Sequence, residues 1–246
     1  MNLLLRYKYH LLAITILLAA MLAGAKTKVT FVTEEATDLP RIETKGQLGQ
    51  ALELLTPQQA AELHTMEIKG DVREFILNTV RASLPEEYRG RAFEVARSLI
   101  IEANHHEMDP LFLMAVAAHE SKFKPKARGL HGEIGLLQIL PSTAAEIAPH
   151  AGVSKELLNL EDPCVNIRIG ATYFAQLRKR FNSHGTRYVS AYNMGTGNVR
   201  KLLAQKIEPK IYSNKVMSHY TSYYTSIEVA ARTSLVATSR SIASVE

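Results

Sequence analysis

Cysteine is almost absent from this chain, since Cys164 is the only one among its 246 residues. A single thiol cannot form an intrachain disulfide, so the fold has to be held together by a packed core. No other motif marks Cys164 as a nucleophile, and a lone cysteine usually behaves as a small apolar side chain. The sequence therefore excludes a disulfide scaffold and does not indicate thiol catalysis.

A strong charge of one sign is also absent. The formal net charge is +5, and residues 1–25 contain two basic and no acidic residues. The remaining chain has 27 basic and 24 acidic residues, a formal charge of +3. An excess this small is not the signature of nucleic-acid binding, and we expect no nucleic-acid partner.

Long apolar runs are missing as well. The longest near the N-terminus, Leu11 to Leu22, is too short to span a bilayer comfortably. Arg6 and Lys8 precede it, and Ala23-Gly-Ala25 follows with small residues in the positions that a signal peptidase requires. We expect residues 1–25 to be a secretory signal that is removed, leaving a soluble protein in the periplasm or outside the cell. An uncleaved anchor or a buried N-terminal helix is the alternative.

The rest of the chain divides into three parts. Residues 26–90 begin with a polar stretch to about residue 50, predicted to be a linker or poorly ordered arm, and continue with two helices that end near Pro85. Capping patterns at Thr56-Pro57 and at Asp71 with Glu74 predict the starts of these helices. Residues 91–224 show helical periodicity, and residues 225–246 are predicted to be a weakly ordered tail. Helix boundaries are expected at Asp109-Pro110, Pro141-Ser142, Asp162-Pro163, Gly195 and Pro209.

One acidic residue stands at the end of an apolar helix. Asp109-Pro110 can open a helix that runs to Glu120, where Glu120 continues the stripe of Leu113, Val116 and Ala117. A carboxyl group on the core-facing row loses water, which raises its pKa and suits it to general acid catalysis. Without further motifs, the commoner interpretation is an exposed glutamate that points to solvent or pairs with Lys122, Lys124, Lys126 or Arg128.

Metal chemistry is not indicated. His105, His106 and His119 match no common zinc spacing, so we predict neither a metal nor another cofactor. After Glu120 come three spaced glycines, Gly129, Gly132 and Gly135, which by themselves predict only a loop whose backbone can approach a ligand closely.

Three blocks in order carry a resemblance. They are Glu120-Ser-Lys-Phe-Lys-Pro-Lys-Ala127, Gly135-Leu-Leu-Gln138 and Ala191-Tyr-Asn-Met-Gly195. This pattern resembles the catalytic domain of the soluble lytic transglycosylases, enzymes of the lysozyme-like superfamily that cut peptidoglycan. The resemblance spans about residues 91–224 and implies a mainly α lysozyme-like domain with a substrate groove, preceded by a short helical N-terminal region.

The resemblance also assigns roles to residues. It implies that Glu120 is the catalytic acid and that Tyr192 directs its hydroxyl towards Glu120. The substrate-binding residues that it implies are Ser121, Gly135, Leu137, Gln138, Tyr192 and Asn193. Leu137 replaces the usual Met, a change that conserves volume, and Met194 replaces the usual Ala at the rim of the groove.

The implied reaction breaks the β-1,4 bond between N-acetylmuramic acid and N-acetylglucosamine and closes a 1,6-anhydro ring. No motif marks a second carboxylate, although Glu102, Glu133 and Asp162 are acidic residues that the fold could bring near Glu120. A hydrolytic muramidase with such a second carboxylate remains an alternative, as does a non-catalytic peptidoglycan-binding module. The partners implied are glycan strands, with cell-envelope machinery as a further candidate for residues 26–90.

Overall fold

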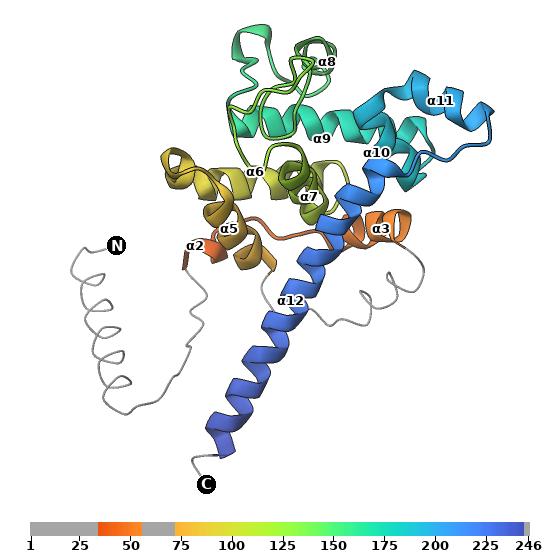
Figure 1. The fold of residues 1–246 in the computed structure, drawn as a ribbon. Helices are drawn as coiled ribbons and strands as arrows, with labels where there is room; N and C mark the ends of the chain where they lie inside the picture. The colour runs from red at the N-terminus through yellow and green to blue at the C-terminus, as the bar shows by residue number, and fades with distance from the viewer. Residues whose placement is uncertain (1–33, 56–71, 244–246) are drawn as a thin grey trace. The chain divides into compact units, whose positions relative to one another are not determined.

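The computed structural model describes residues 34–55 and 72–243, apart from the side chains of 34, 228 and 230–243 (Figure 1). The predicted signal sequence in residues 1–25 and the predicted helix start at Thr56-Pro57 lie outside the described residues. Among the described residues, those up to Ala231 belong to a first compact unit, and those from Arg232 to 243 belong to a second. The site described below belongs entirely to the first unit.

The described residues are helical, which confirms the mainly α prediction; isolated β-bridges join only Arg128, Ile134 and Ile139. No helix in the described ranges is long and apolar enough to cross a membrane. The α-helices are α2 (Glu34–Thr37), α3 (Thr44–Leu54), α5 (Val72–Ser83), α6 (Ala92–His105), α7 (Pro110–Glu120), α8 (Pro141–Ile147), α9 (Pro163–Arg180), α10 (Gly185–Met194), α11 (Thr196–Ala204) and α12 (Ile211–Ala243). The described residues also contain two short 3₁₀ helices, η1 (Glu86–Arg91) and η2 (Lys155–Leu157).

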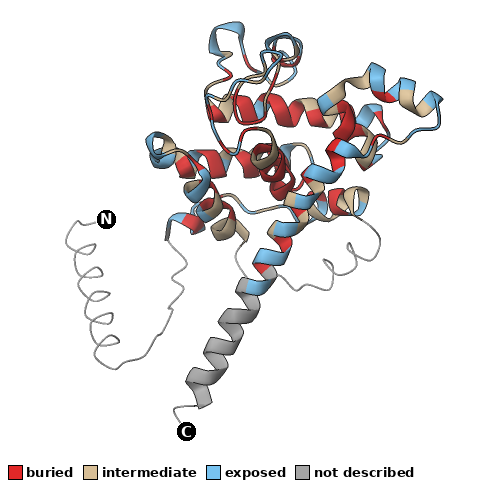
Figure 2. Ribbon diagram, in the orientation of Figure 1, coloured by how far each residue is buried: buried red, intermediate tan, exposed pale blue. Residues whose placement is uncertain are grey.

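Helix α7 is the centre of the core. Every residue from Pro110 to Ala117 is buried, so the helix is covered on all sides rather than along one stripe as the periodicity predicted (Figure 2). An apolar helix with no polar face is stable only inside such an envelope. Only its last turn, residues 118–120, is partly exposed, and this places Glu120 where the core meets the surface.

The predicted proline breaks all fall at helix boundaries. The Asp109 side chain accepts a hydrogen bond from the backbone N–H of Leu111, and Asp162 accepts from those of Cys164 and Val165. Each aspartate thus caps a helix that has proline at its first position, where the missing N–H costs nothing. Local chemistry alone explains where α7 and α9 begin.

The N-terminal region is not a linker from residue 34 onwards, contrary to the prediction. The buried Gln50 side chain of α3 donates to the Tyr188 hydroxyl at 3.1 Å and accepts from the backbone N–H of Asp109 at 2.8 Å. Glu53 forms an ion pair with Arg178 of α9. Polar composition misled the prediction, because these polar side chains find partners within the main domain rather than water.

Helix α12 contacts both ends of α7. Near the start of α7, the Tyr220 hydroxyl donates to Asp109 Oδ2 at 2.7 Å, and the Tyr224 hydroxyl donates to the same oxygen. Burial raises the pKa of Asp109 to about 6, and the two phenols oppose that rise by hydrogen bonding. The helix continues to Ala243. The weak ordering expected for residues 225–246 stays a prediction. Alanine-containing segments propagate a helix readily once it has begun.

Candidate active site

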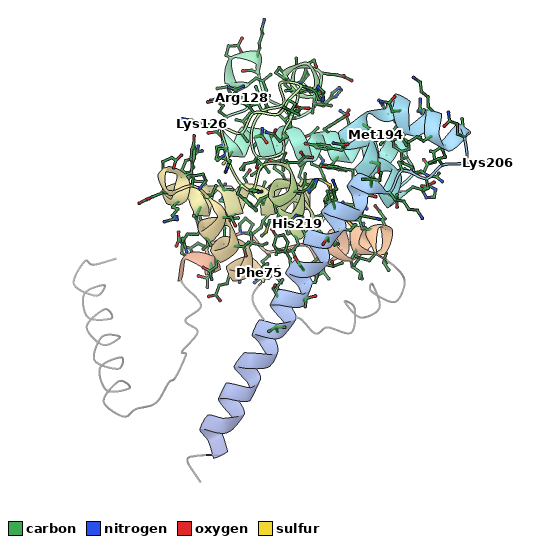
Figure 3. The ribbon with its side chains drawn as sticks, in the orientation of Figure 1. Phe75, Lys126, Arg128, Met194, Lys206 and His219 are labelled. Carbon is green, nitrogen blue, oxygen red and sulfur yellow. The ribbon has the colours of Figure 1, made fainter. Side chains whose placement is uncertain are left out.

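A pocket of about 480 Å³ opens beside the last turn of α7. Its walls come from Glu120, from the loop that follows α7, from α9 and from the end of α10. Met194, labelled in Figure 3, is the last residue of α10 and part of the rim. The lining residues are Glu120, Gly129, Leu130, His131, Glu133, Gln138, Ile139, Leu140, Thr143, Tyr173, Tyr192, Asn193, Met194 and Gly195.

Glu120 has the protonation behaviour of a general acid. Burial raises its pKa from 4.5 to about 7; a hydrogen bond from Tyr212 opposes this rise, and the charge of Glu133 adds to it. Removal of water penalises the ionised carboxylate more than the neutral acid. Near neutral pH a substantial share of Glu120 is therefore protonated and able to donate a proton to a group in the pocket.

Tyr212 holds the acid in place. Its hydroxyl donates a hydrogen bond to Glu120 Oε1, and its ring lies 5.3 Å from that of His119 in an edge-on arrangement. Burial and the neighbouring Glu120 raise the pKa of Tyr212 well above its usual value, so the phenol keeps its proton and remains a donor. The sequence interpretation missed this residue. The only signal was the spacing of Tyr212, Tyr220 and Tyr224, which lie eight and four residues apart and therefore on one face of a helix.

Asn166 fixes the shape of the loop that carries Gly129, Gly132 and Gly135, called the glycine loop below. Its amide group donates to the carbonyls of Ile134 at 2.9 Å and Leu160 at 3.0 Å, and its carbonyl accepts from the backbone N–H of Leu137 at 2.8 Å. Gly135 passes directly over this side chain with φ +86°; a Cβ there would lie 2.2 Å from Asn166 Nδ2. Both the dihedral angle and the lack of space require glycine at position 135.

Gln138 lines the pocket, with part of its hydrogen-bonding capacity already used. Its Nε2 donates to the carbonyls of Gly135 at 2.9 Å and Ala127 at 3.2 Å. Its Oε1 has no protein partner among the described residues, which leaves an acceptor next to the pocket. The residue has a positive φ of 49°, a conformation that the loop imposes. The sequence predicted both a donor and an acceptor for the substrate, whereas the geometry leaves only the acceptor.

Tyr192 and Asn193 also line the pocket, but Tyr192 does not hydrogen-bond to Glu120. Its hydroxyl donates instead to the Leu137 carbonyl at 2.7 Å, and its ring stacks on Phe174 at 4.0 Å with an interplanar angle of 6°. Tyr212 makes the bond to the acid that the family resemblance implied for Tyr192. Tyr192 therefore forms part of the wall and ties α10 to the glycine loop.

Three of the predicted binding residues do not line the pocket. Ser121 is buried, and its hydroxyl donates to the Ala117 carbonyl at 3.2 Å, so it closes the end of α7. The Leu137 side chain is fully buried against Gly170 of α9, and Gly135 lies over Asn166. These residues shape the backbone around the pocket, because the chain turns between Gly135 and Gln138 and directs adjacent side chains to opposite sides.

A second carboxylate reaches the pocket. Glu133 is one of its lining residues, and its Oε2 accepts a hydrogen bond from the backbone N–H of His131 at 2.9 Å. The other two acidic residues named from the sequence lie elsewhere: Glu102 is buried in an ion pair with Arg168, and Asp162 caps α9 and pairs with Arg91. Within the described ranges, no group of three or more His, Cys, Asp or Glu side chains is arranged to hold a metal ion.

Comparison with known proteins gives matches over the same region. Residues 98–214 match the family model described as Transglycosylase SLT domain. The soluble lytic murein transglycosylase of Escherichia coli K12 is 34% identical over 102 residues, which is 39% of this chain and 15% of that protein. Membrane-bound lytic murein transglycosylase E of Buchnera aphidicola (Acyrthosiphon pisum) is 33% identical over 112 residues, covering 42% of this chain and 51% of that protein.

Solved structures give a weaker likeness. The structure of an inactive mutant of lytic transglycosylase Slt from Pseudomonas aeruginosa aligns with 76% of this chain and 38% of that one. The aligned residues are 22% identical and the TM-score is 0.49. The chain thus spans less than two thirds of each of these three proteins.

Proposed function

Because residues 98–214 match the family model described as Transglycosylase SLT domain, we propose that the pocket beside Glu120 is the active site of a peptidoglycan lytic transglycosylase. The substrate is then the glycan strand, cut at the β-1,4 bond between N-acetylmuramic acid and N-acetylglucosamine. The observation that carries the proposal is Glu120 itself, a partly buried acid with a pKa of about 7, oriented by Tyr212 at the edge of the pocket.

The reaction begins with proton transfer from Glu120. The proton goes to the oxygen that links the two sugars, and the bond from that oxygen to C1 of N-acetylmuramic acid breaks. The N-acetyl group of the substrate supports the positive charge that develops at C1. The oxygen of the C6 hydroxyl then bonds to C1, its proton passes to the ionised Glu120, and a 1,6-anhydro ring results. Glu120 ends in its starting state, so one residue suffices as acid and base.

The other pocket residues support binding and orientation. Tyr212 fixes the Glu120 carboxyl group through its hydrogen bond, and the free Gln138 Oε1 can accept a hydrogen bond from a sugar hydroxyl. The rings of Tyr173 and Tyr192, 5.4 Å apart, supply aromatic surface of the kind on which sugar rings pack.

The experiment is digestion of purified sacculi followed by mass spectrometry of the released fragments. The wild-type protein should release fragments that end in anhydro-muramic acid, one water lighter than hydrolysis products. Glu120→Gln keeps the size of the side chain but removes the acid, so cleavage should fall by about 10²–10⁴-fold. Glu156→Gln, the same change at an exposed position outside the pocket, is the matched control and should retain activity.

The alternatives separate in the same experiment. A non-catalytic wall-binding module would bind sacculi and release no fragments from either protein. Wild-type cleavage by a folded Glu120→Gln protein would move the chemistry to another residue.

We also propose that the protein is exported. The support is the N-terminal sequence, in which Arg6 and Lys8, the apolar run and Ala23-Gly-Ala25 follow in the order of a cleaved signal. N-terminal sequencing of protein recovered from the periplasm or the medium should begin near Lys26. Recovery of intact Met1 in the membrane fraction would contradict cleavage.

A further inference from the structure

Glu133 is a carboxylate that the single-acid reaction does not use. It lines the same pocket as Glu120, and the bond from the His131 N–H to Oε2 is the only hydrogen bond that its side chain makes to protein among the described residues. It forms no ion pair within the described ranges, and none of the described pocket-lining residues is Lys or Arg. Its Oε1 is therefore available to a molecule in the pocket.

The loop leaves room for this carboxylate beside the pocket. A Cβ on Gly129 would lie 2.2 Å from Glu133 Oε2 and 2.9 Å from Gln138 Oε1, so both side chains occupy the space that glycine leaves open. Position 129 has no positive φ that would call for glycine on conformational grounds. The absence of a side chain at Gly129 thus allows the side chains of Glu133 and Gln138 to lie beside the pocket.

Glycosidases that hydrolyse their substrate with water generally have two carboxyl groups in the active site. One donates the proton to the leaving oxygen, and the other removes a proton from the attacking water. The electrostatics agree with this closeness, because the charge of Glu133 adds to burial in raising the pKa of Glu120. Tyr212 of α12 hydrogen-bonds to Glu120, and Tyr192 of α10 lines the pocket beside it together with Glu133 and His131 of the loop.

We propose that Glu133 is a second catalytic residue, a general base that lets water replace the C6 hydroxyl in part of the turnovers. This inference rests on the proposed function. Glu120 gives its proton to the leaving oxygen as the bond to C1 breaks. The oxygen of water bonds to C1, and the proton of water passes to Glu133. The fragment then ends in muramic acid with a free reducing group, and solvent exchanges the protons on Glu120 and Glu133.

Water needs this assistance in order to compete. The C6 hydroxyl is held on the same sugar, and well-oriented intramolecular groups correspond to effective concentrations of about 10⁵ M or more. Water reacts only at its bulk concentration, which is far lower, but a positioned general base typically raises the rate of its attack by about 10²–10⁴-fold. We therefore expect hydrolysis to be the minor route in the wild-type protein and to become undetectable without the base.

The test counts new reducing ends. Sacculi are first treated with borohydride to remove existing reducing ends, then digested, then treated with borodeuteride, and the fragments are analysed by mass spectrometry. The wild-type protein should give anhydro ends together with a smaller share of deuterium-labelled ends. Glu133→Gln should still form anhydro ends, while the labelled share falls by about 10²-fold or more. Glu133→Asp, which keeps the carboxylate, should recover part of that share.

The outcomes are distinct. A wild-type digest with anhydro ends alone would overturn the inference and leave the proposed function intact. An unchanged labelled share in Glu133→Gln would also overturn it. Because the share is a ratio of two products of one protein sample, partial unfolding of a variant does not alter it. Cleavage that survives in Glu120→Gln would instead contradict the proposed function.

Discussion

The hydrogen bond from Tyr212 to Glu120 leads to a prediction about pH dependence. Tyr212→Phe removes one hydroxyl and leaves the buried ring in place between α12 and α7. The phenol stabilises the ionised form of Glu120, since its hydrogen bond opposes the rise in pKa that burial causes. Loss of the hydroxyl should therefore raise the pKa of Glu120 further above about 7.

The size of the effect follows from the strength of such bonds. A hydrogen bond to a charged group contributes about 1.5–3 kcal/mol, and about 1.4 kcal/mol corresponds to one pH unit. Because Glu120 acts in its protonated form, activity is lost as pH rises through its pKa. In Tyr212→Phe the alkaline limb of the pH profile should move upward by about 1–2 pH units. The maximum rate should fall by about tenfold, since the acid is no longer oriented.

The assay is the initial rate of sacculus lysis, as kcat/KM, from pH 5 to pH 10. Tyr220→Phe is the matched control, because it makes the same change on the same helix at the Asp109 end of α7. The control should leave the alkaline limb of the profile where the wild type has it. An unmoved limb in Tyr212→Phe, or a limb moved to lower pH, would refute the role given to Tyr212.

Three further predictions concern stability. Because the pKa of Glu120 is raised in the folded state, its contribution to stability is fully present below pH 4.5 and is lost as pH rises through about 7. Glu120→Gln should therefore be more stable than wild type by about 2–3 kcal/mol at pH 9 and similar at pH 4. Equal urea midpoints of the two proteins at pH 9 would contradict this. Gly135→Ala should cost about 3 kcal/mol or more, because its Cβ would meet Asn166 and φ is positive; a thermal midpoint near wild type would show that the loop has room. Tyr192→Phe leaves the Leu137 carbonyl without its donor and should cost about 1–3 kcal/mol in chemical unfolding, whereas no loss would imply that another donor replaces the hydroxyl.

Local chemistry made much of the fold predictable. The Asp-Pro pairs at 109–110 and 162–163 define helix starts through hydrogen bonds within three residues, so the sequence alone contains the information. The arrangement around α3 was not predictable in this way. Gln50 and Glu53 look like solvated residues in the sequence, and only their partners more than fifty residues away show that they pack against the main domain.

In the candidate site, too, residues within short sequence motifs were predictable and residues that depend on distant contacts were not. Glu120 and Gln138 were found because their blocks are short, whereas Tyr212 lies 92 residues from Glu120 and belongs to none of the blocks. Adjacent residues in one block can also face opposite ways. Leu137 is buried while Gln138 lines the pocket, and that difference depends on how Asn166 holds the loop.

Glu120 can act as the acid only if a substantial share of it is protonated near neutral pH. An NMR titration of the side-chain carboxyl carbon, with protein labelled at glutamate and the signal assigned by its absence in Glu120→Gln, measures this directly. We expect a midpoint of about 7, well above the ordinary value of 4.5. A midpoint near 4.5 would contradict it, because Glu120 would then be ionised at neutral pH and another group would have to supply the proton.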